Sequence, residues 1–245
     1  MRCQLQLKRM VYKCTNINQA CLLCNETTEQ PYPLCVACEI ELPWLDDGCQ
    51  VCALPLPMHG LTCAQCTRRA PAFYRVETPW HYGFPLDALI SRFKYNSQWP
   101  TGRLLAQLLG RWLTHRFGEG LPRPTLLLPV PLSRRKLRQR GYNQAAMLAR
   151  WLATHTGIPC TERSLKRLVD TPAQQGLKAR ERKRNLHQAF AIEDTQALEG
   201  RHVALIDDVL TTGATAQAIA SLLRKAGVRR VDVYCLARTA KPGSA

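Results

Sequence analysis

The sequence predicts an α/β protein, in which a parallel sheet with helices on both faces follows a small cysteine-rich module. Two observations support this fold class. Pairs of cysteines recur at even spacing in the first 70 residues, and apolar strand-like segments alternate with amphipathic helical segments through the rest of the chain. A chain of 245 residues is long enough for one domain with a sizeable core and a smaller module beside it.

The cysteine-rich module contains four CxxC pairs, with ten residues between each pair and the next. Two such pairs present four thiolates to one metal ion, and a reducing cytosol disfavours disulfides, so we expect two structural Zn²⁺ ions. A redox pair or a catalytic zinc is the alternative, but catalytic zinc usually keeps an open position and four thiolates close the site. The expected ligands are Cys21, Cys24, Cys35, Cys38, Cys49, Cys52, Cys63 and Cys66.

The equal spacing leaves open whether neighbouring or alternating CxxC pairs share a zinc ion. The segments between neighbours are short, and residues 55–62 (PLPMHGLT) have the composition of a turn within a hairpin. Neighbouring pairs are therefore preferred. His59, near the tip of that hairpin, is interpreted as a surface turn residue rather than a ligand.

The second part of the chain is predicted element by element from its apolar spacing. Residues 75–83 are typical of a strand or hairpin, residues 86–95 and 102–117 of helices, residues 125–132 of a buried strand, and residues 143–154 of a helix. Alternating strands and helices imply a parallel sheet that is covered on both faces.

The last unit has the clearest pattern. VALI at 203–206 is apolar throughout, as in a central parallel strand; an amphipathic helix is expected at 215–226 and the next strand at 231–237. Ligands of such sheets bind beyond the carboxyl ends of the strands, which is where Asp207 and Asp208 lie.

The segment after these acids has the composition of a phosphate site. Small and hydroxylated residues at the start of a helix direct backbone N–H groups toward an anion, and the helix dipole adds partial positive charge. The segment lacks the lysine and the glycine spacing of a Walker loop. The residues expected to hold the phosphate are Thr211, Thr212, Gly213, Ala214 and Thr215.

Two carboxylates beside a phosphate site repel a bare phosphate, so they need hydroxyl donors or a bound cation as partners. A ribose 5-phosphate provides its phosphate for the loop and its 2- and 3-hydroxyls for Asp207 and Asp208. An uninvolved strand-to-helix turn is the alternative, but two adjacent aspartates at the end of a buried strand are costly to desolvate.

Positive charge is concentrated in the second part of the chain. The protein has 34 Lys plus Arg against 18 Asp plus Glu, a formal net charge of +16, while residues 1–70 hold six basic and six acidic side chains. The whole excess therefore lies in residues 71–245. It favours a polyanionic partner, such as nucleic acid or a phosphorylated metabolite, although a solvated surface position explains any single Lys or Arg.

The sequence also sets expectations for location and boundaries. Residues 1–20 contain no apolar stretch of signal-peptide length, and no segment approaches the roughly 20 apolar residues of a membrane span, so we expect a cytoplasmic protein without membrane insertion. We expect an unstructured extension at 1–20, a double zinc ribbon at 21–68 and the α/β domain at 69–245. Met10 is an alternative start to Met1.

The segment that contains Asp207 and Asp208, and then most of the chain, resemble known protein families. Four apolar residues, two acids, two more apolar residues and TTGAT resemble the phosphoribosyl pyrophosphate (PRPP) signature of type I phosphoribosyltransferases. From about residue 20 to 240 the chain resembles the ComF/GntX family, which joins a cysteine-rich zinc-ribbon region to such a domain. The likeness includes LPWL (42–45), FKY (93–95), PVPLSRRKLRQRGYNQA (129–145) and TPAQQGLKARERKRNLHQAF (171–190).

The resemblance implies roles for two cationic segments. It places pyrophosphate against the loop after the strand at 125–132, and a mobile flap over PRPP. By physics alone, a solvated basic turn explains Arg138 and Arg140 equally well, and residues 178–184 equally suit a nucleic-acid-binding loop. The implied pyrophosphate ligands are Arg134, Arg135 and Lys136, and the implied flap residues are Gln174, Arg182 and Asn185.

The implied chemistry is displacement at the anomeric carbon of PRPP, with Mg²⁺ bridging the pyrophosphate and the ribose hydroxyls. The sequence identifies neither a general base nor an acceptor. The second hypothesis is a non-catalytic protein that binds single-stranded DNA, with Tyr95, Trp99 and Tyr142 as stacking or packing residues. The resemblance further implies a role in DNA uptake or in the use of external DNA as a nutrient, and a DNA-translocating ATPase as a partner of the zinc ribbons.

Overall fold

The computed structural model describes residues 19–168 and 189–240. The chain forms two compact units, Met1–Leu42 and Pro43–Ala245, so the division falls between the two halves of the double ribbon. The sequence places the boundary later, between residues 68 and 69. In the described part of the chain, no helix is both long and apolar enough to cross a membrane.

The first unit contains the short antiparallel strands β1 (Gln19–Ala20) and β2 (Thr27–Thr28) and the helix α2 (Val36–Ile40). The turn between the strands carries the first CxxC pair, and it closes where Asn25, at φ 65°, donates its backbone N–H to the carbonyl of Cys21 at 2.9 Å. Left-handed backbone suits asparagine better than most residues.

The second ribbon repeats this turn within the larger unit. Ala53 takes a φ of 53° and donates to the carbonyl of Cys49 at 2.8 Å, as Asn25 does to Cys21. Gly48 forms an antiparallel bridge with Pro55 across this turn. Residues 55–62, where a hairpin was expected, contain a turn at 59–60, and no strand pairing is described between the two ends of this segment. The ribbon ends in the helix α3 (Ala64–Arg68).

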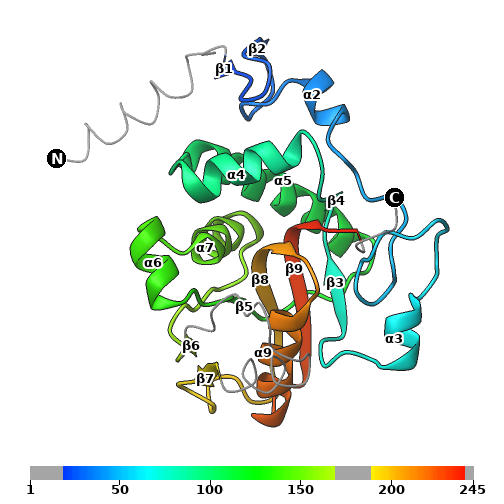
Figure 1. Ribbon diagram of the computed structural model, residues 1–245, viewed down its shortest axis with the longest axis vertical. Coiled ribbons are helices and arrows are strands. Elements are labelled where there is room, and N and C mark those ends of the chain that lie inside the picture. The colour runs from blue at the N-terminus through cyan, green and yellow to red at the C-terminus, as the bar shows by residue number, and fades with distance from the viewer. Residues whose placement is uncertain (1–18, 169–188, 241–245) are drawn as a thin grey trace, which may run out of the picture. The chain divides into compact units, whose positions relative to one another are not determined.

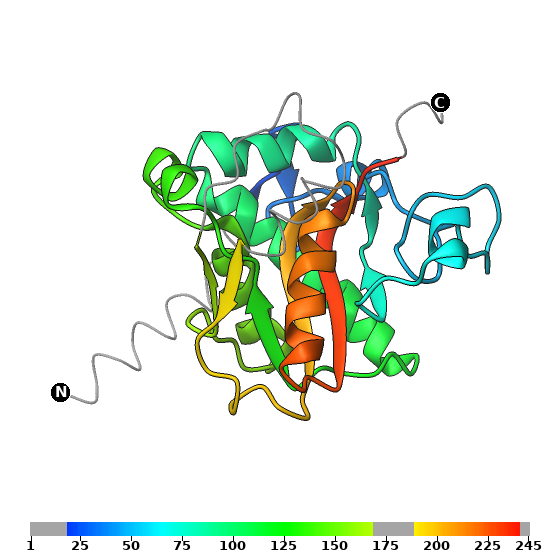
Figure 2. The same ribbon diagram turned by 60° about the horizontal axis from the view of Figure 1, so that its bottom comes forward.

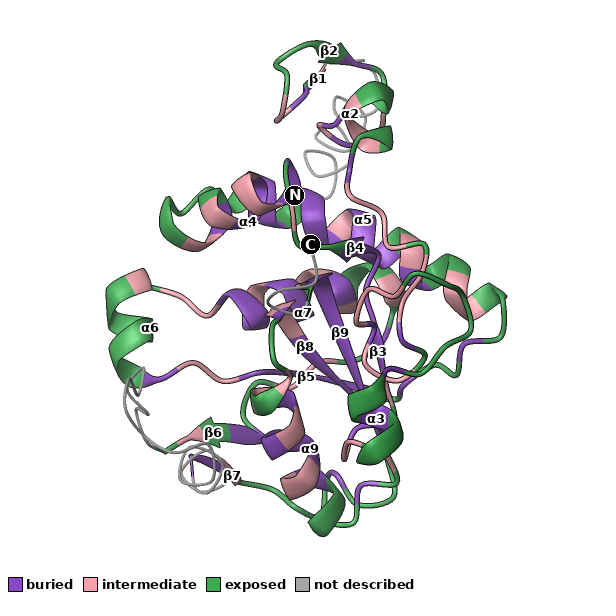
Figure 3. Cartoon of the chain, turned by 45° about the vertical axis from the view of Figure 1, so that its right-hand side comes forward, coloured by how far each residue is buried: buried purple, intermediate pink, exposed green. Residues whose placement is uncertain are grey.

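The sheet of the larger unit is parallel, as predicted (Figure 1). Its order is β3–β9–β8–β5, and β4 continues along the free side of β9 beyond β3, so the hairpin alternative for residues 75–83 was wrong. The central strands β8 and β9 are almost entirely buried (Figure 3). The strands are β3 (Arg75–Glu77), β4 (Trp80–His81), β5 (Leu126–Pro129), β8 (His202–Leu210) and β9 (Arg230–Arg238).

Helices cover both faces of the sheet. The helix α9 (Ala214–Lys225) crosses in front of β8 and β9 in Figure 2, where Val203 and Leu205 join its apolar side chains in one core cluster. Strand residues alternate between faces, so Ala204 and Ile206 point to the opposite side, which α7 (Gln144–Thr156) covers. Behind α7 lie α5 (Trp99–Gly118) and α4 (Leu86–Tyr95).

Two features at the carboxyl edge of the sheet differ from the prediction or add to it. The cationic segment after β5 was expected as a loop, but residues Arg134–Arg140 form the helix α6, which begins at the N-cap Ser133 and ends at Gly141 with φ 79°. A separate antiparallel pair, β6 (Leu165–Arg167) and β7 (Phe190–Ile192), brings Arg167 toward the same edge.

Candidate functional site

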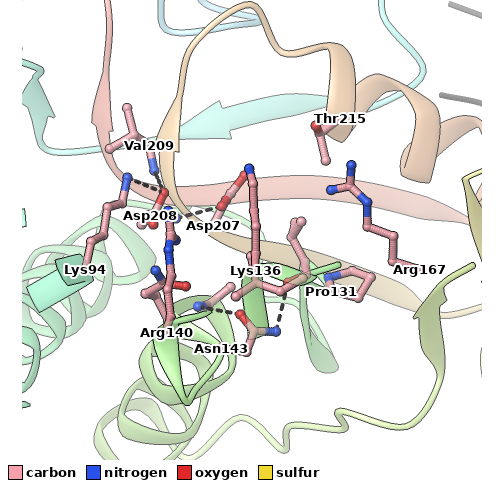
Figure 4. Close-up of a pocket in the computed structure, with 14 residues that line it drawn as sticks. Lys94, Pro131, Lys136, Arg140, Asn143, Arg167, Asp207, Asp208, Val209 and Thr215 are labelled. Atoms are coloured by element: carbon pink, nitrogen blue, oxygen red, sulfur yellow. Dashed lines mark hydrogen bonds and ion pairs between the residues drawn. The ribbon is translucent and has the colours of Figure 1, made fainter. Parts of the chain in front are cut away.

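A pocket of about 170 Å³ lies at the carboxyl ends of β5 and β8 (Figure 4). Its walls come from five parts of the chain: the end of α4, the segment after β5 with α6, the start of α7, the end of β6, and the turn from β8 into α9. This is the edge at which parallel α/β sheets bind ligands. The fold thus gathers charged side chains that are far apart in sequence.

Asp207 and Asp208 form one wall of the pocket. The Asp208 backbone N–H donates to Oδ1 of Asp207 at 2.9 Å, and Lys94 Nζ lies 3.0 Å from Oδ1 of Asp208. Burial, and then the neighbouring Asp208 carboxylate, raise the pKa of Asp207 to about 7. Near neutral pH, Asp207 is therefore able to accept or donate a hydrogen bond, as a ligand rich in hydroxyl groups requires.

Four cations face these two acids. Lys94 comes from the end of α4, Lys136 and Arg140 from α6, and Arg167 from the end of β6. Partial burial of its amine, with Arg140 nearby, lowers the pKa of Lys136. Figure 4 shows the Lys136 amine beside Asp207, with Arg167 and Thr215 across from Lys94. The excess of positive charge suits a polyanion that also offers hydroxyl groups to the acids.

The start of α9 supplies a further anion site. Gly213 is the N-cap residue and has a φ of 73°, a left-handed conformation that glycine adopts without strain. No side chain caps the helix at this residue, and Thr215, in the first turn, lines the pocket. The first N–H groups of a helix have no intrahelical acceptor, so they point toward an incoming anion together with the helix dipole.

The structure brings four of the predicted ligand residues into one pocket: Lys136, Asp207, Asp208 and Thr215. Arg134 and Arg135 lie on the exposed first turn of α6 and are not among the described residues that line the pocket. The remaining predicted residues lie on the loop before α9 or outside the described residues. Thr211, Thr212, Gly213 and Ala214 form the loop and first helical position, and Gln174, Arg182 and Asn185 fall outside the described ranges.

The sequence predicted no pocket role for Lys94, Asn143 or Arg167, and it left Arg140 equally open between a pyrophosphate contact and a solvated turn. All four residues line the pocket. Lys94 belongs to the FKY motif. That motif supported the family resemblance, but it did not predict the contact of Lys94 with Asp208. Asn143 caps α7, accepting from Ala145 N at 3.1 Å, and its amide donates to the carbonyl of Val130. Arg167 follows Lys166 at the end of β6 and has no distinguishing sequence signal.

The eight cysteines form two clusters of four, and neighbouring CxxC pairs share a cluster, as preferred from the sequence. The sulfur atoms of each cluster lie within 4.8 Å of one another. Cys24 Sγ lies 3.7 Å from Cys35 Sγ, and Cys52 Sγ lies 3.6 Å from Cys63 Sγ. Zn–S bonds of about 2.3 Å require S···S separations of about 3.8 Å in a tetrahedron, so both clusters fit closed structural zinc sites.

Comparison with known proteins agrees with these features. A family model described as "Phosphoribosyl transferase domain" matches residues 145–244, and one described as "Double zinc ribbon domain" matches residues 17–67. Competence protein F of Haemophilus influenzae is 36% identical over 209 residues, which are 84% of this chain and 90% of that protein.

One further relative and one solved structure are each similar to part of this chain. DNA utilization protein YhgH of Salmonella typhi is 36% identical over 192 residues, 78% of this chain and 84% of that protein. Among solved structures, the allosteric regulatory enzyme of purine biosynthesis is 23% identical over 54% of this chain and 25% of its own, with a TM-score of 0.37.

Proposed function

The chain belongs to the ComF/GntX family, to which competence protein F and DNA utilization protein YhgH belong, and from this membership we propose that its α/β domain binds PRPP or a ribose 5-phosphate. The observation that carries the proposal is the placement of Asp207, Asp208 and Thr215 in the same pocket as four cations. Acids for sugar hydroxyls, a helix start for the 5-phosphate and cations for pyrophosphate are the three groups that PRPP needs.

In this proposal each group has a separate task. The N-terminus of α9 binds the 5-phosphate, Asp207 and Asp208 orient the ribose through its hydroxyls, and Lys136 with Arg140 and Arg167 neutralises the pyrophosphate. Mg²⁺ bound with PRPP would supply further positive charge to the departing pyrophosphate. These groups would position PRPP and neutralise the departing pyrophosphate while a nucleophilic acceptor, which the pocket does not identify, forms the new bond at the anomeric carbon.

Calorimetric titration with ribose 5-phosphate, and with PRPP plus Mg²⁺, tests this proposal. We expect the double variant Asp207→Asn/Asp208→Asn to lose about tenfold or more in affinity, because neutral amides replace two hydroxyl-orienting carboxylates. The control is Glu26→Gln/Glu29→Gln, in which neutral amides replace two exposed carboxylates of the first compact unit. Undiminished affinity in the Asp207/Asp208 variant would contradict the proposed site.

Single-stranded DNA binding is a second candidate function, favoured by the rim of the pocket. Tyr95 and Trp99 are 68% and 54% exposed, and the Arg140 guanidinium lies 5.0 Å from the centre of the Tyr95 ring, within hydrogen-bond reach of its hydroxyl. Exposed rings beside cations are the elements that stack bases and contact phosphates.

Fluorescence anisotropy with a labelled single strand, across a salt series, tests this candidate. We expect affinity to fall with salt, and Tyr95→Ala/Trp99→Ala to weaken binding by about 1–3 kcal/mol per lost stacking contact. Tyr74→Ala is the control, since Tyr74 is also exposed and lies under Arg230, at 3.9 Å from its ring centre, but at the amino end of the sheet. Salt-independent binding would argue against this function.

The names of these relatives, a competence protein and a DNA utilization protein, also support a role in DNA uptake or utilization. From the family resemblance, we further propose a DNA-translocating ATPase as a partner. We place the docking surface on the zinc ribbons. A pull-down with the ATPase that is unaffected by removal of residues 1–42 would exclude the first ribbon as that surface.

A further inference from the structure

Arg238, the last residue of β9, ties the second ribbon to the loop before α9. Its side chain is buried, at 6% exposure. The Nε atom donates to the carbonyl of Cys52 at 3.0 Å, and Nη1 donates to the carbonyl of Leu210 at 3.0 Å and to that of Thr211. Nη1 also donates to the Thr239 carbonyl at 2.9 Å. One guanidinium therefore contacts a zinc-ligand residue and the first residue of the phosphate loop.

We propose that Arg238 is a positioning residue through which the second zinc ribbon sets the conformation of the loop Thr211–Thr215. Zinc at the second cluster would then raise the affinity of the pocket for a sugar phosphate, although no zinc ligand touches that pocket. The consequence for affinity rests on the proposed function. The coupling between the ribbon and the loop does not.

The cost of burying a charge makes this contact set interdependent. Among the described residues, the hydrogen-bond partners of the Arg238 guanidinium are carbonyl oxygens and the Thr239 hydroxyl, with no carboxylate. A buried cation is tolerated only while its hydrogen bonds are made. Displacement of the Cys52 carbonyl removes one acceptor, and the guanidinium then has to move, which releases the carbonyls of Leu210 and Thr211.

Two further contacts join the second ribbon to the same region. Ala72, just after the ribbon, donates its backbone N–H to Oε1 of Gln217 on α9 at 2.8 Å. Val76 of β3 donates to the carbonyl of Val51, next to the zinc ligand Cys52, at 2.9 Å. The segment after the ribbon thus contacts α9 through Ala72, the ribbon contacts the sheet through Val51, and it reaches the loop through Arg238.

Zinc acts on this contact through a single residue. The fit of Cys49, Cys52, Cys63 and Cys66 to a tetrahedral site means that a bound ion would restrain the Cys52 side chain, and with it the peptide whose carbonyl accepts from Arg238. Loss of the ion frees that peptide, so the effect should reach the loop, and Thr215 with it, without the substitution of any pocket residue.

Hydrogen–deuterium exchange of residues 209–215 in the full-length zinc-loaded protein tests the coupling directly. We expect Arg238→Met to speed exchange of this segment about tenfold, and Arg238→Lys to do so as well, because one amine does not span Cys52 and Thr211. Arg230→Met is the matched control: it removes a guanidinium from the other end of β9, next to buried Asp232, and should leave the loop unchanged. Equal exchange in wild type and both Arg238 variants would overturn the proposal.

The zinc arm compares one ligand substitution in each ribbon. We expect Cys66→Ser to speed loop exchange and to weaken ribose 5-phosphate binding about tenfold, and Cys38→Ser, in the other compact unit, to do neither. An equal response to both substitutions, or to neither, would also overturn the proposal. If Cys66→Ser does not fold, the Arg238 variants decide. If wild type binds no ribose 5-phosphate while exchange responds as expected, the proposed function fails and the coupling stands.

Discussion

Asp207 is placed so that its own ionisation opposes folding. Its carboxyl lies beside that of Asp208 at the end of a buried strand, and burial with this neighbour raises its pKa to about 7 from the usual 3.8. Between these two values the folded chain keeps a proton that the unfolded chain has released. The free energy of unfolding therefore falls as the pH rises from about 4 to 7, and the loss persists above pH 7.

We expect Asp207→Asn to raise the free energy of unfolding of the ligand-free protein by about 1–2 kcal/mol at pH 8. The gain should vanish at about pH 3 and below, where wild-type Asp207 is protonated in both states, so the pH series contains its own control. Urea denaturation at a set of pH values measures it. A gain that is constant with pH would show that the amide acts through packing and not through charge.

The same residues show what sequence can predict of a site. Asp207, Asp208 and Thr215 are predictable because they share one local pattern of strand, loop and helix start. Lys94 reaches Asp208 across 114 positions of the chain, a contact that depends on how α4 packs and that no local pattern encodes. Arg167 is placed by the short strand β6, whose register is a property of the folded chain.

At the scale of elements, the packing of α4 against α5 determines where Lys94 points. Phe93, the residue before Lys94, is fully buried, and the space beside its ring is occupied by the backbone of Gly102 in α5. A Cβ atom at position 102 would lie 2.4 Å from the Phe93 ring, far inside contact distance. Glycine is therefore required here, although it is a poor helix former.

We expect Gly102→Ala to destabilise the protein by about 1–3 kcal/mol through overpacking, despite the better helix propensity of alanine. The matched control is Gly118→Ala at the end of the same helix, where a Cβ atom meets nothing within 4 Å; it should be neutral or stabilise by up to about 1 kcal/mol. Thermal and urea unfolding of the two variants compare them. Equal effects would mean that Phe93 moves aside at little cost.

Helices with an apolar face were predicted, and the helix without one was not. α4, α5, α7 and α9 each bury a set of regularly spaced side chains, which is the signal that periodicity detects. α6 buries none of its seven residues. Its helical form is consistent with its caps, because Ser133 accepts from Lys136 N and Gly141 ends the helix in the left-handed region.

At the scale of the whole molecule, the cysteines are evenly spaced, but the two ribbons belong to different compact units of the chain. The spacing suggested one double-ribbon module, yet the second ribbon belongs to the compact unit of the sheet. Ala53 of the second ribbon is buried in the core cluster that contains Val76. Leu45, which precedes the second ribbon, donates its backbone N–H to the carbonyl of Pro79. These contacts depend on tertiary packing, to which motif spacing is insensitive.

Because the second ribbon belongs to the unit of the sheet, we expect two truncated chains, one with this ribbon and one without it, to differ in stability. A chain of residues 43–245 keeps the second cluster, the bond from Arg238 to Cys52 and the antiparallel bridge of Trp44 to Trp80. We expect it to fold, to bind one zinc ion per chain and to keep the ribose 5-phosphate affinity of the full chain.

A chain of residues 69–245 begins at the boundary that the sequence suggests, and it lacks the acceptors of Arg238 and Val76 in the ribbon. The exposed core and the partly unsatisfied guanidinium should lower its Tm by about 10 °C or more relative to residues 43–245. Differential scanning fluorimetry, zinc content and ribose 5-phosphate titration of the two fragments measure the difference. Equal stability would mean that the second ribbon is an independent module and that its contacts with the sheet contribute little free energy. A large loss confined to the shorter fragment would place the functional boundary between the ribbons, at residues 42 and 43.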